Sequence, residues 1–97
     1  MSRLRELELS ETTIKYIINS YNEDVIDNID IYIDDIKQNI IFLRSIGINN
    51  IEELLKTDIT IFFQPVSDTK EVVNEIGLEK TINMLLEDSE CIRYLLK

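Results

Sequence analysis

The sequence predicts an all-α protein of five or six helices that form a single domain over residues 1–97. A chain of 97 residues is long enough for one hydrophobic core. Its two glycines and one proline are too few for the many tight turns of an all-β protein. Its apolar residues recur at spacings of three and four, which is the period of an amphipathic helix.

The longest periodic segment, Val25 to Gly47, predicts one long central helix over residues 26–46 around which the other helices pack. One stripe of this helix would carry six branched aliphatic residues, Ile26, Ile29, Ile33, Ile36, Ile40 and Leu43. Residues 29–34 also alternate between isoleucine and a polar residue in the strand period of two. The helical period covers far more of the segment, so length favours the helix.

Capping chemistry places the remaining helices. Their expected N-caps are Ser10, then Asn49 or Asn50, then Ser67 or Asp68. The second of these helices would extend to Lys56 and the third would close at Gly77. Two short helices, over residues 79–86 and 90–96, would finish the chain.

Residues 58–63, DITIFF, have strand propensity but no obvious partner strand. We therefore expect an irregular or 3₁₀ turn there, ended by Pro65, because the residue before a proline avoids the helical region. The side chains that this turn would pack inward are Ile59, Ile61, Phe62 and Phe63.

A short motif occurs three times, which predicts an irregular helical repeat. Each copy joins a helix end to a short amphipathic helix through an apolar turn, and the copies are Leu4–Leu9, Leu43–Ile48 and Val73–Leu78. Gly47 and Gly77 occupy the same position in two copies, and we expect positive φ at both. Glu8 holds this position in the first copy, so either that helix ends differently or residues 1–9 form a loose N-terminal arm. We favour the arm, because few residues precede Glu8.

The segments ELELSETTI, SIGINNIEEL and EIGLEKTIN carry a family resemblance. They are similar to the turn that follows each long helix in the repeat of mitochondrial transcription termination factors (mTERF-type), a repeat also found in small bacterial mTERF-like proteins. DITIFFQP departs from the second turn of that repeat, because Pro65 comes after the apolar turn. The resemblance covers most of the chain. It implies a helical-repeat fold and nucleic-acid binding along a basic concave surface, although this sequence has no matching row of basic residues.

FLRSIGINNIEELLK and IGLEKTINMLL are similar to the hairpins of paired helix-hairpin-helix modules, such as the C-terminal domain of the bacterial RNA polymerase α subunit. In those modules the backbone N–H groups of a glycine turn bind phosphate at a helix N-terminus. Here the two glycines are far apart for such a pair, and Glu79 lies beside the second turn. No functional residue is carried over from either family.

The composition predicts a protein that is not an enzyme and takes no metal or cofactor. The chain has no histidine and one cysteine, which excludes zinc sites and histidine-activated nucleophiles. Cys91 is expected as a small buried apolar residue. The four tyrosines are expected at the core boundary with their hydroxyls in water. No apolar run approaches ~18 residues, so we expect no membrane span and a cytoplasmic location.

Charge points to the class of partner. Nineteen acidic residues against ten basic ones give a net charge of −9, which repels phosphate backbones and attracts basic surfaces. No basic residue lies between Lys15 and Lys37. The hypothetical contact surface, which we call the acidic edge, comprises Glu23, Asp24, Asp27, Asp30, Asp34 and Asp35. Asp27, Asp30 and Asp34 would share one edge of the central helix. They lack the glycine turn and the carbonyl ligands of a calcium loop.

The sequence therefore predicts a small acidic protein-binding domain whose partner has a basic surface. It would act as an inhibitor or adaptor of a nucleic-acid-binding protein, by analogy with phage and mobile-element proteins. The alternative is an mTERF-like or helix-hairpin-helix module that binds nucleic acid itself. The identity of the partner, the biological process and the oligomeric state stay open at this stage.

Overall fold

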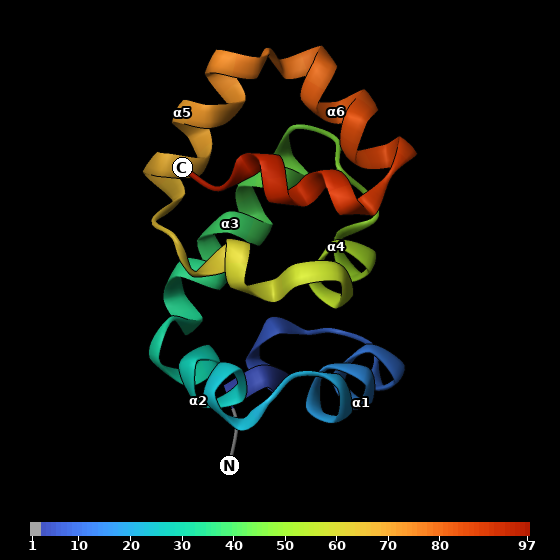
Figure 1. The fold of residues 1–97 in the computed structure, drawn as a ribbon, viewed down its shortest axis with the longest axis vertical. Coiled ribbons are helices and arrows are strands. Elements are labelled where there is room, and N and C mark those ends of the chain that lie inside the picture. The colour runs from blue at the N-terminus through green and yellow to red at the C-terminus, as the bar shows by residue number, and fades with distance from the viewer. Residues whose placement is uncertain (1–2) are drawn as a thin grey trace.

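The computed structural model describes residues 3–97, and every regular element in that range is a helix (Figure 1). Its elements are η1 (Arg3–Leu7), α1 (Glu11–Ser20), α2 (Glu23–Ile31), α3 (Ile33–Ser45), α4 (Ile51–Asp58), η2 (Ile59–Phe63), α5 (Val66–Ile76), α6 (Leu78–Glu87) and η3 (Ser89–Leu95), where η marks a 3₁₀ helix. The all-α prediction is confirmed. The expected count of five or six helices is slightly low, because three 3₁₀ helices add to the six α-helices. No helix of the described range is long and apolar enough to cross a membrane.

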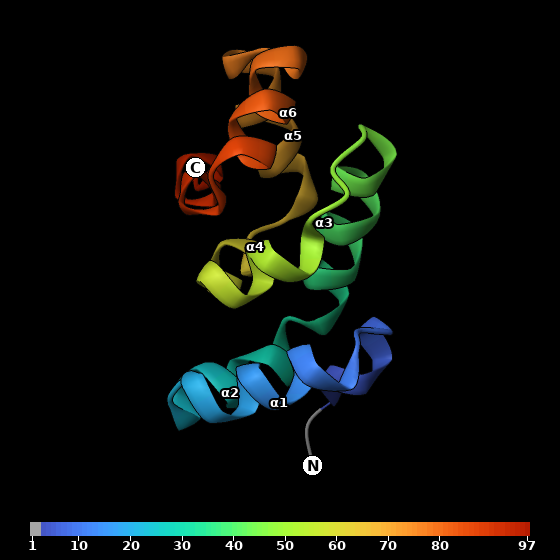
Figure 2. The same cartoon turned by 90° about the vertical axis from the view of Figure 1, so that its right-hand side faces the viewer.

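The molecule is elongated, with principal extents of 38, 23 and 20 Å. Its elements lie in three zones along the long axis (Figures 1 and 2). η1, α1 and α2 form the N-terminal end, whereas α3, α4 and η2 occupy the middle. α5, α6 and η3 form the C-terminal end. One hydrophobic core extends through all three zones, from Leu4 to Leu95.

The single central helix predicted over residues 26–46 is wrong, because the chain breaks at Tyr32. Tyr32 has φ −102° and ψ 19°, and α2 and α3 leave it in different directions (Figure 2). Its two neighbours, Ile31 and Ile33, are β-branched, so this short run has weak helix propensity. The Tyr32 ring stacks on Phe63 of η2, with ring centroids 5.2 Å apart and planes inclined by 18°. Local propensity and this long-range contact both favour the break.

The predicted apolar stripe of this segment still faces the core on both sides of the break. Ile26 is half-buried, and the other five side chains are at most 3% exposed: Ile29, Ile33, Ile36, Ile40 and Leu43. α2 packs on η1, whereas α3 packs on η2 and α5. The part of the stripe on α2 therefore packs in the N-terminal zone, and the part on α3 packs in the middle and C-terminal zones.

Residues 3–9, for which we expected a loose arm, are packed against the core. Leu4, Leu7 and Leu9 are all buried, and η1 contacts both α2 and α3. The backbone N–H of Arg3 donates a hydrogen bond to Asp30 Oδ1 at 2.6 Å. The arm prediction is wrong for these residues, because three leucines find apolar neighbours there; residues 1–2 lie outside the described range.

The three turn positions all have positive φ. Gly47 and Gly77 both have φ 104°, as predicted, and Glu8 has φ 57°. After α3, the N–H of Ile48 bonds to the carbonyl of Leu43 and the N–H of Gly47 to that of Arg44. This pair of bonds is a Schellman motif, which satisfies carbonyls that the helix leaves free.

The predicted caps are partly right. The Ser10 hydroxyl accepts a hydrogen bond from the N–H of Thr13, which confirms Ser10 as the N-cap of α1. Asn50 holds the N-cap position of α4 but makes no side-chain cap bond; its amide donates to the carbonyl of Leu85 instead. α5 starts at Val66, so the predicted caps at Ser67 and Asp68 are wrong. Pro65 precedes it, and its fixed φ suits a helix entry.

The predicted C-terminal segments are close to the observed ones. α4 ends at Asp58, two residues later than expected. The 3₁₀ turn over residues 58–63 is confirmed as η2, although Phe63 is half-buried rather than buried. The two final helices are present as α6 and η3, and the latter is 3₁₀. Cys91 is half-buried against the core.

A buried polar cluster joins α3 to the C-terminal end. Asn39 and Thr69 are 1% and 2% exposed. The Asn39 amide donates to the carbonyls of Phe62 (3.0 Å) and Gln64 (2.8 Å), and the Thr69 hydroxyl donates to Asn39 Oδ1 (2.5 Å). Gln64 Nε2 in turn donates to Thr69 Oγ1 and to the carbonyl of Leu95. These bonds satisfy groups that would otherwise be buried without partners.

Tyr21 plays a similar part beside α4. Its hydroxyl donates to the carbonyl of Leu55 at 2.6 Å and accepts from the N–H of Ile59 at 2.8 Å. Burial raises the pKa of Tyr21 to about 12. The expectation of a hydroxyl in water is therefore wrong for Tyr21, because the end of α4 supplies backbone partners.

Candidate protein-binding surface

The break at Tyr32 divides the acidic edge between two helices. Glu23, Asp24, Asp27 and Asp30 lie on α2, and Asp34 and Asp35 lie in the first turn of α3. Asp30 and Asp35 are half-buried, whereas the other four are exposed. The predicted placement of Asp27, Asp30 and Asp34 along one helix edge is wrong, because Asp34 belongs to a helix with a different direction.

Four of the six carboxylates have a local structural role. The side chain of Asn22 caps α2 by accepting a hydrogen bond from the N–H of Val25 at 3.0 Å. Glu23 and Asp24 occupy the first turn of α2, and Asp34 and Asp35 occupy that of α3. Negative charge there interacts favourably with the N-terminal end of the helix dipole. Helix formation therefore explains why acids stand at these positions, whatever they bind.

The basic groups nearest in the fold leave most of this charge uncompensated. Arg3 and Lys37 both form ion pairs with Glu6, at 2.6 and 2.8 Å. Hydrogen bonds from Arg3 and then from Lys37 lower the pKa of Glu6 to about 2, so Glu6 stays ionised. Asp30 accepts from the Arg3 backbone rather than from a basic side chain in that bond.

The other five members of the acidic edge form no ion pair within residues 3–97: Glu23, Asp24, Asp27, Asp34 and Asp35. The surface thus keeps its negative charge. In the same part of the chain, no group of three or more aspartate, glutamate or cysteine side chains is arranged to hold a metal ion.

Sequence reasoning missed a second surface, at the C-terminal end. A hollow between α5, α6 and the last residues of the chain is lined by Val72, Glu75, Ile76, Lys80, Met84, Tyr94, Leu96 and Lys97. Tyr94 and Leu96 are 67% and 57% exposed. The apolar period of α6 gives no signal for this surface, because Met84 is the apolar residue of α6 that lines the hollow, whereas the exposed Leu78 and Leu86 lie outside it.

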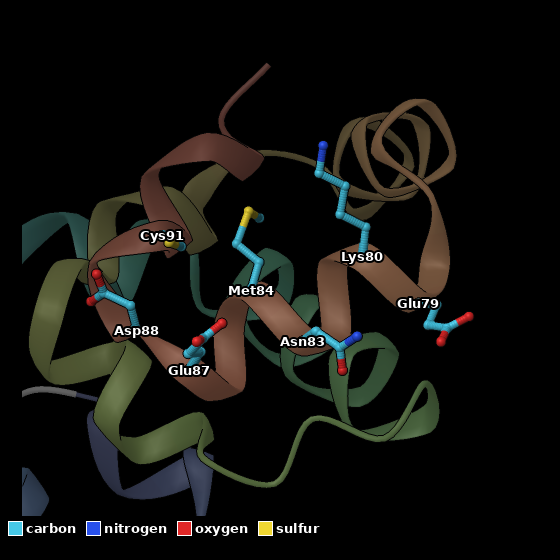
Figure 3. A pocket seen from close by; sticks show the side chains of 7 residues that line it. All are labelled: Glu79, Lys80, Asn83, Met84, Glu87, Asp88 and Cys91. Atoms are coloured by element: carbon cyan, nitrogen blue, oxygen red, sulfur yellow. The ribbon is translucent and has the colours of Figure 1, made fainter.

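A second hollow continues the first along α6 (Figure 3). It shares Lys80 and Met84 with the first and adds Glu79, Asn83, Glu87, Asp88 and Cys91. Lys80 and Met84 project to the same side of α6, and Glu79 lies beyond Lys80 at one end of the hollow (Figure 3). We call the two joined hollows the C-terminal groove.

No protein-family model, curated protein or solved structure matches this chain. The resemblances to mTERF-like repeats and to helix-hairpin-helix modules therefore stay predictions.

Proposed function

We propose that this protein is a small acidic, non-enzymatic binding domain whose partner is a protein with a basic surface, and that the acidic edge makes the contact. The observation that carries the proposal is the set of five carboxylates that form no ion pair within residues 3–97; of these, Asp34 alone lies in the field of the Arg3 guanidinium. The net charge of the whole chain, which includes these carboxylates, is −9 and has the same sign.

Physical chemistry supports this class of partner over others. Charge on an exposed helix surface gains little from burial, but it steers an oppositely charged protein and raises the association rate. A nucleic-acid-binding protein has such a basic surface where phosphates normally lie. An acidic protein that covers that surface acts as an inhibitor, and one that also holds another protein acts as an adaptor. The proposed setting is the cytoplasm, where a phage or mobile-element protein meets such enzymes.

The runner-up is direct nucleic-acid binding, and one observation favours it. Gly47 and Gly77 both have positive φ shortly before a new helix, as a phosphate-binding hairpin requires. Acidic residues nevertheless occupy the first turns of both following helices, Glu52 and Glu53 in α4 and Glu79 in α6. Hydrogen bonds from Thr13 and Ser10 lower the pKa of Glu52, which holds a negative charge where a phosphate would bind. The acidic-edge proposal therefore has the stronger support.

The test compares two triple variants that each remove three negative charges. The edge variant is Asp24→Asn, Asp27→Asn and Asp34→Asn, which spares Asp30 because Asp30 holds the N–H of Arg3. The rim variant is Glu75→Gln, Glu79→Gln and Glu87→Gln, three exposed acids at the C-terminal end. The immobilised chain is used to capture partners from an extract of its host, with identification by mass spectrometry.

We expect the wild type and the rim variant to capture the same basic protein, and the edge variant to lose it. Equal capture by the edge variant contradicts the proposal. Fluorescence anisotropy with labelled single- and double-stranded DNA and RNA tests the runner-up at about 0.15 M salt, where exposed charges are screened beyond about 8 Å. Saturable binding to free nucleic acid would establish the runner-up instead.

A further inference from the structure

The C-terminal groove contains apolar side chains from three segments of the chain. α5, α6 and η3 form a triangle at the C-terminal end of the molecule (Figure 1). Val72 and Ile76 come from α5, Met84 from α6, and Tyr94 and Leu96 from the end of the chain. These residues adjoin one another rather than being scattered singly over the surface. Tyr94 and Leu96 are exposed, Ile76 and Met84 are half-buried and Val72 is buried, so the hollow offers a small apolar floor with charged residues beside it.

The negative charge around the groove favours a basic partner. Four carboxylates, which we call the rim, stand along it: Glu75, Glu79, Glu87 and Asp88. None of the four forms an ion pair within residues 3–97. Lys97 is occupied by ion pairs with Glu71 and Asp68. Lys80 is the remaining base of the lining, and its long stem lets the ammonium turn out to solvent while the methylenes stay in the groove.

The length of the groove along α6 favours a helical partner. α6 has ten residues and is therefore about 15 Å long, which matches roughly three turns of a second helix laid beside it. Met84 lies where the two hollows join, and methionine adapts its flexible side chain to different apolar partners. An amphipathic helix placed here would set its apolar stripe against Ile76, Met84 and Leu96.

We propose that the C-terminal groove is a second docking site, and that it takes a cationic amphipathic helix. The apolar face of that helix packs on the groove, and its lysines or arginines pair with the rim. This surface is separate from the acidic edge, which lies at the N-terminal end of the molecule and at the start of α3 (Figure 1). The two proposals can therefore fail independently.

The probe for this test is a synthetic peptide of about 14 residues, long enough for roughly four helical turns. It carries leucine at positions i, i+3, i+4 and i+7, lysine elsewhere, and one tryptophan in place of a leucine. The protein has no tryptophan, so the fluorescence of the peptide reports its own environment. We expect a saturable blue shift when the full-length protein is added. A peptide with the same composition in scrambled order, and one with glutamate in place of lysine, should bind at least about tenfold more weakly, because each loses one of the two interactions.

Variants at exposed positions test the location without endangering the fold. The groove variant is Tyr94→Gln with Leu96→Gln, and its matched control is Ile31→Gln with Ile41→Gln, two residues that are 71% and 60% exposed elsewhere. The groove variant should weaken peptide binding by roughly fivefold or more, whereas the control should not. The rim variant should weaken it and the edge variant should leave it nearly unchanged.

Three results would overturn the proposal. The first is no saturable fluorescence change with the wild type. The second is equal weakening by the groove variant and its control, which would mean non-specific attraction to an acidic protein. The third comes from sedimentation equilibrium of the protein alone: a dimer that the groove variant dissociates would assign the groove to a second copy of this chain.

Discussion

The acidic edge and the C-terminal groove lie at different ends of an elongated molecule, and they present negative charge in different surroundings. At the edge, four of the six carboxylates stand in the first turns of α2 and α3, where the helix dipole also favours them. At the groove, carboxylates border a contiguous apolar surface. Charge alone governs how fast a partner arrives, whereas charge beside apolar surface also determines how long it stays. We therefore expect the edge to act mainly on association and the groove on dissociation.

The largest expected effect removes both surfaces at once. Ile33 is a core residue, 1% exposed, at the start of α3, and it directly precedes Asp34 of the acidic edge. Ile33→Asp buries an unpaired charge, which should cost about 4 kcal/mol or more and abolish cooperative unfolding. Circular dichroism during thermal melting measures this. A variant that kept the helicity and melting temperature of the wild type would place Ile33 outside the core.

The next effect should separate the two ends. Asn39→Ala removes the donor to the carbonyls of Phe62 and Gln64 and the acceptor of the Thr69 O–H, at a cost of about 2–4 kcal/mol. Urea unfolding measures the loss, and Gln38→Ala at the exposed neighbouring position is the control. Hydrogen exchange should rise most in α5 and η3, next to the groove. A uniform rise across α1 and α2 as well would show that the two ends are not separable.

The glycine turns allow a finer comparison. Gly47→Ala and Gly77→Ala should each destabilise the fold by about 1 kcal/mol, because both residues have φ 104°. A Cβ at either position would meet no atom within 4 Å, so the cost is conformational and not steric. Gly77 joins α5 to α6, so its replacement should also weaken peptide binding at the groove, whereas that of Gly47 should not. Urea unfolding and the fluorescence titration together check this, and an equal effect of both on the peptide would contradict it.

A further effect is a pH dependence of stability at alkaline pH. Burial raises the pKa of Tyr21 from 10.0 to about 12 in the folded state, so the folded protein retains the proton that the unfolded chain loses. This contribution to stability is fully present below pH 10 and is lost as the pH rises to about 12. Tyr21→Phe should flatten the free energy of unfolding in this window, measured by urea titration at several pH values. Tyr94→Phe, at an exposed tyrosine, is the control, and an unchanged slope in Tyr21→Phe would contradict the assignment.

The sequence predicted features that depend on neighbouring residues. The apolar stripe, the Ser10 cap and the positive φ at both glycines all follow from local spacing and residue type. It did not predict the break at Tyr32, because the stacking partner Phe63 is remote in sequence. Four of the six acidic-edge residues are exposed as expected, but their distribution over two helices depended on that break.

Two other features depended on contacts between distant segments. Asn39 resembles any polar residue on a helix until Thr69 and Gln64 are brought beside it. The groove is lined by side chains from α5, α6 and residues 88–97, and periodicity alone does not show which residues these segments bring together.

The central claim is that the acidic edge receives a basic protein, and its association rate tests this most directly. Stopped-flow fluorescence would follow the captured partner as it binds the wild type, the edge variant and the rim variant at increasing salt. We predict that the edge variant associates roughly tenfold or more slowly at low salt and depends less on salt, because steering follows the local field. The rim variant, with the same net charge, should behave like the wild type. Equal rates and equal salt dependence for the edge and rim variants would contradict the claim.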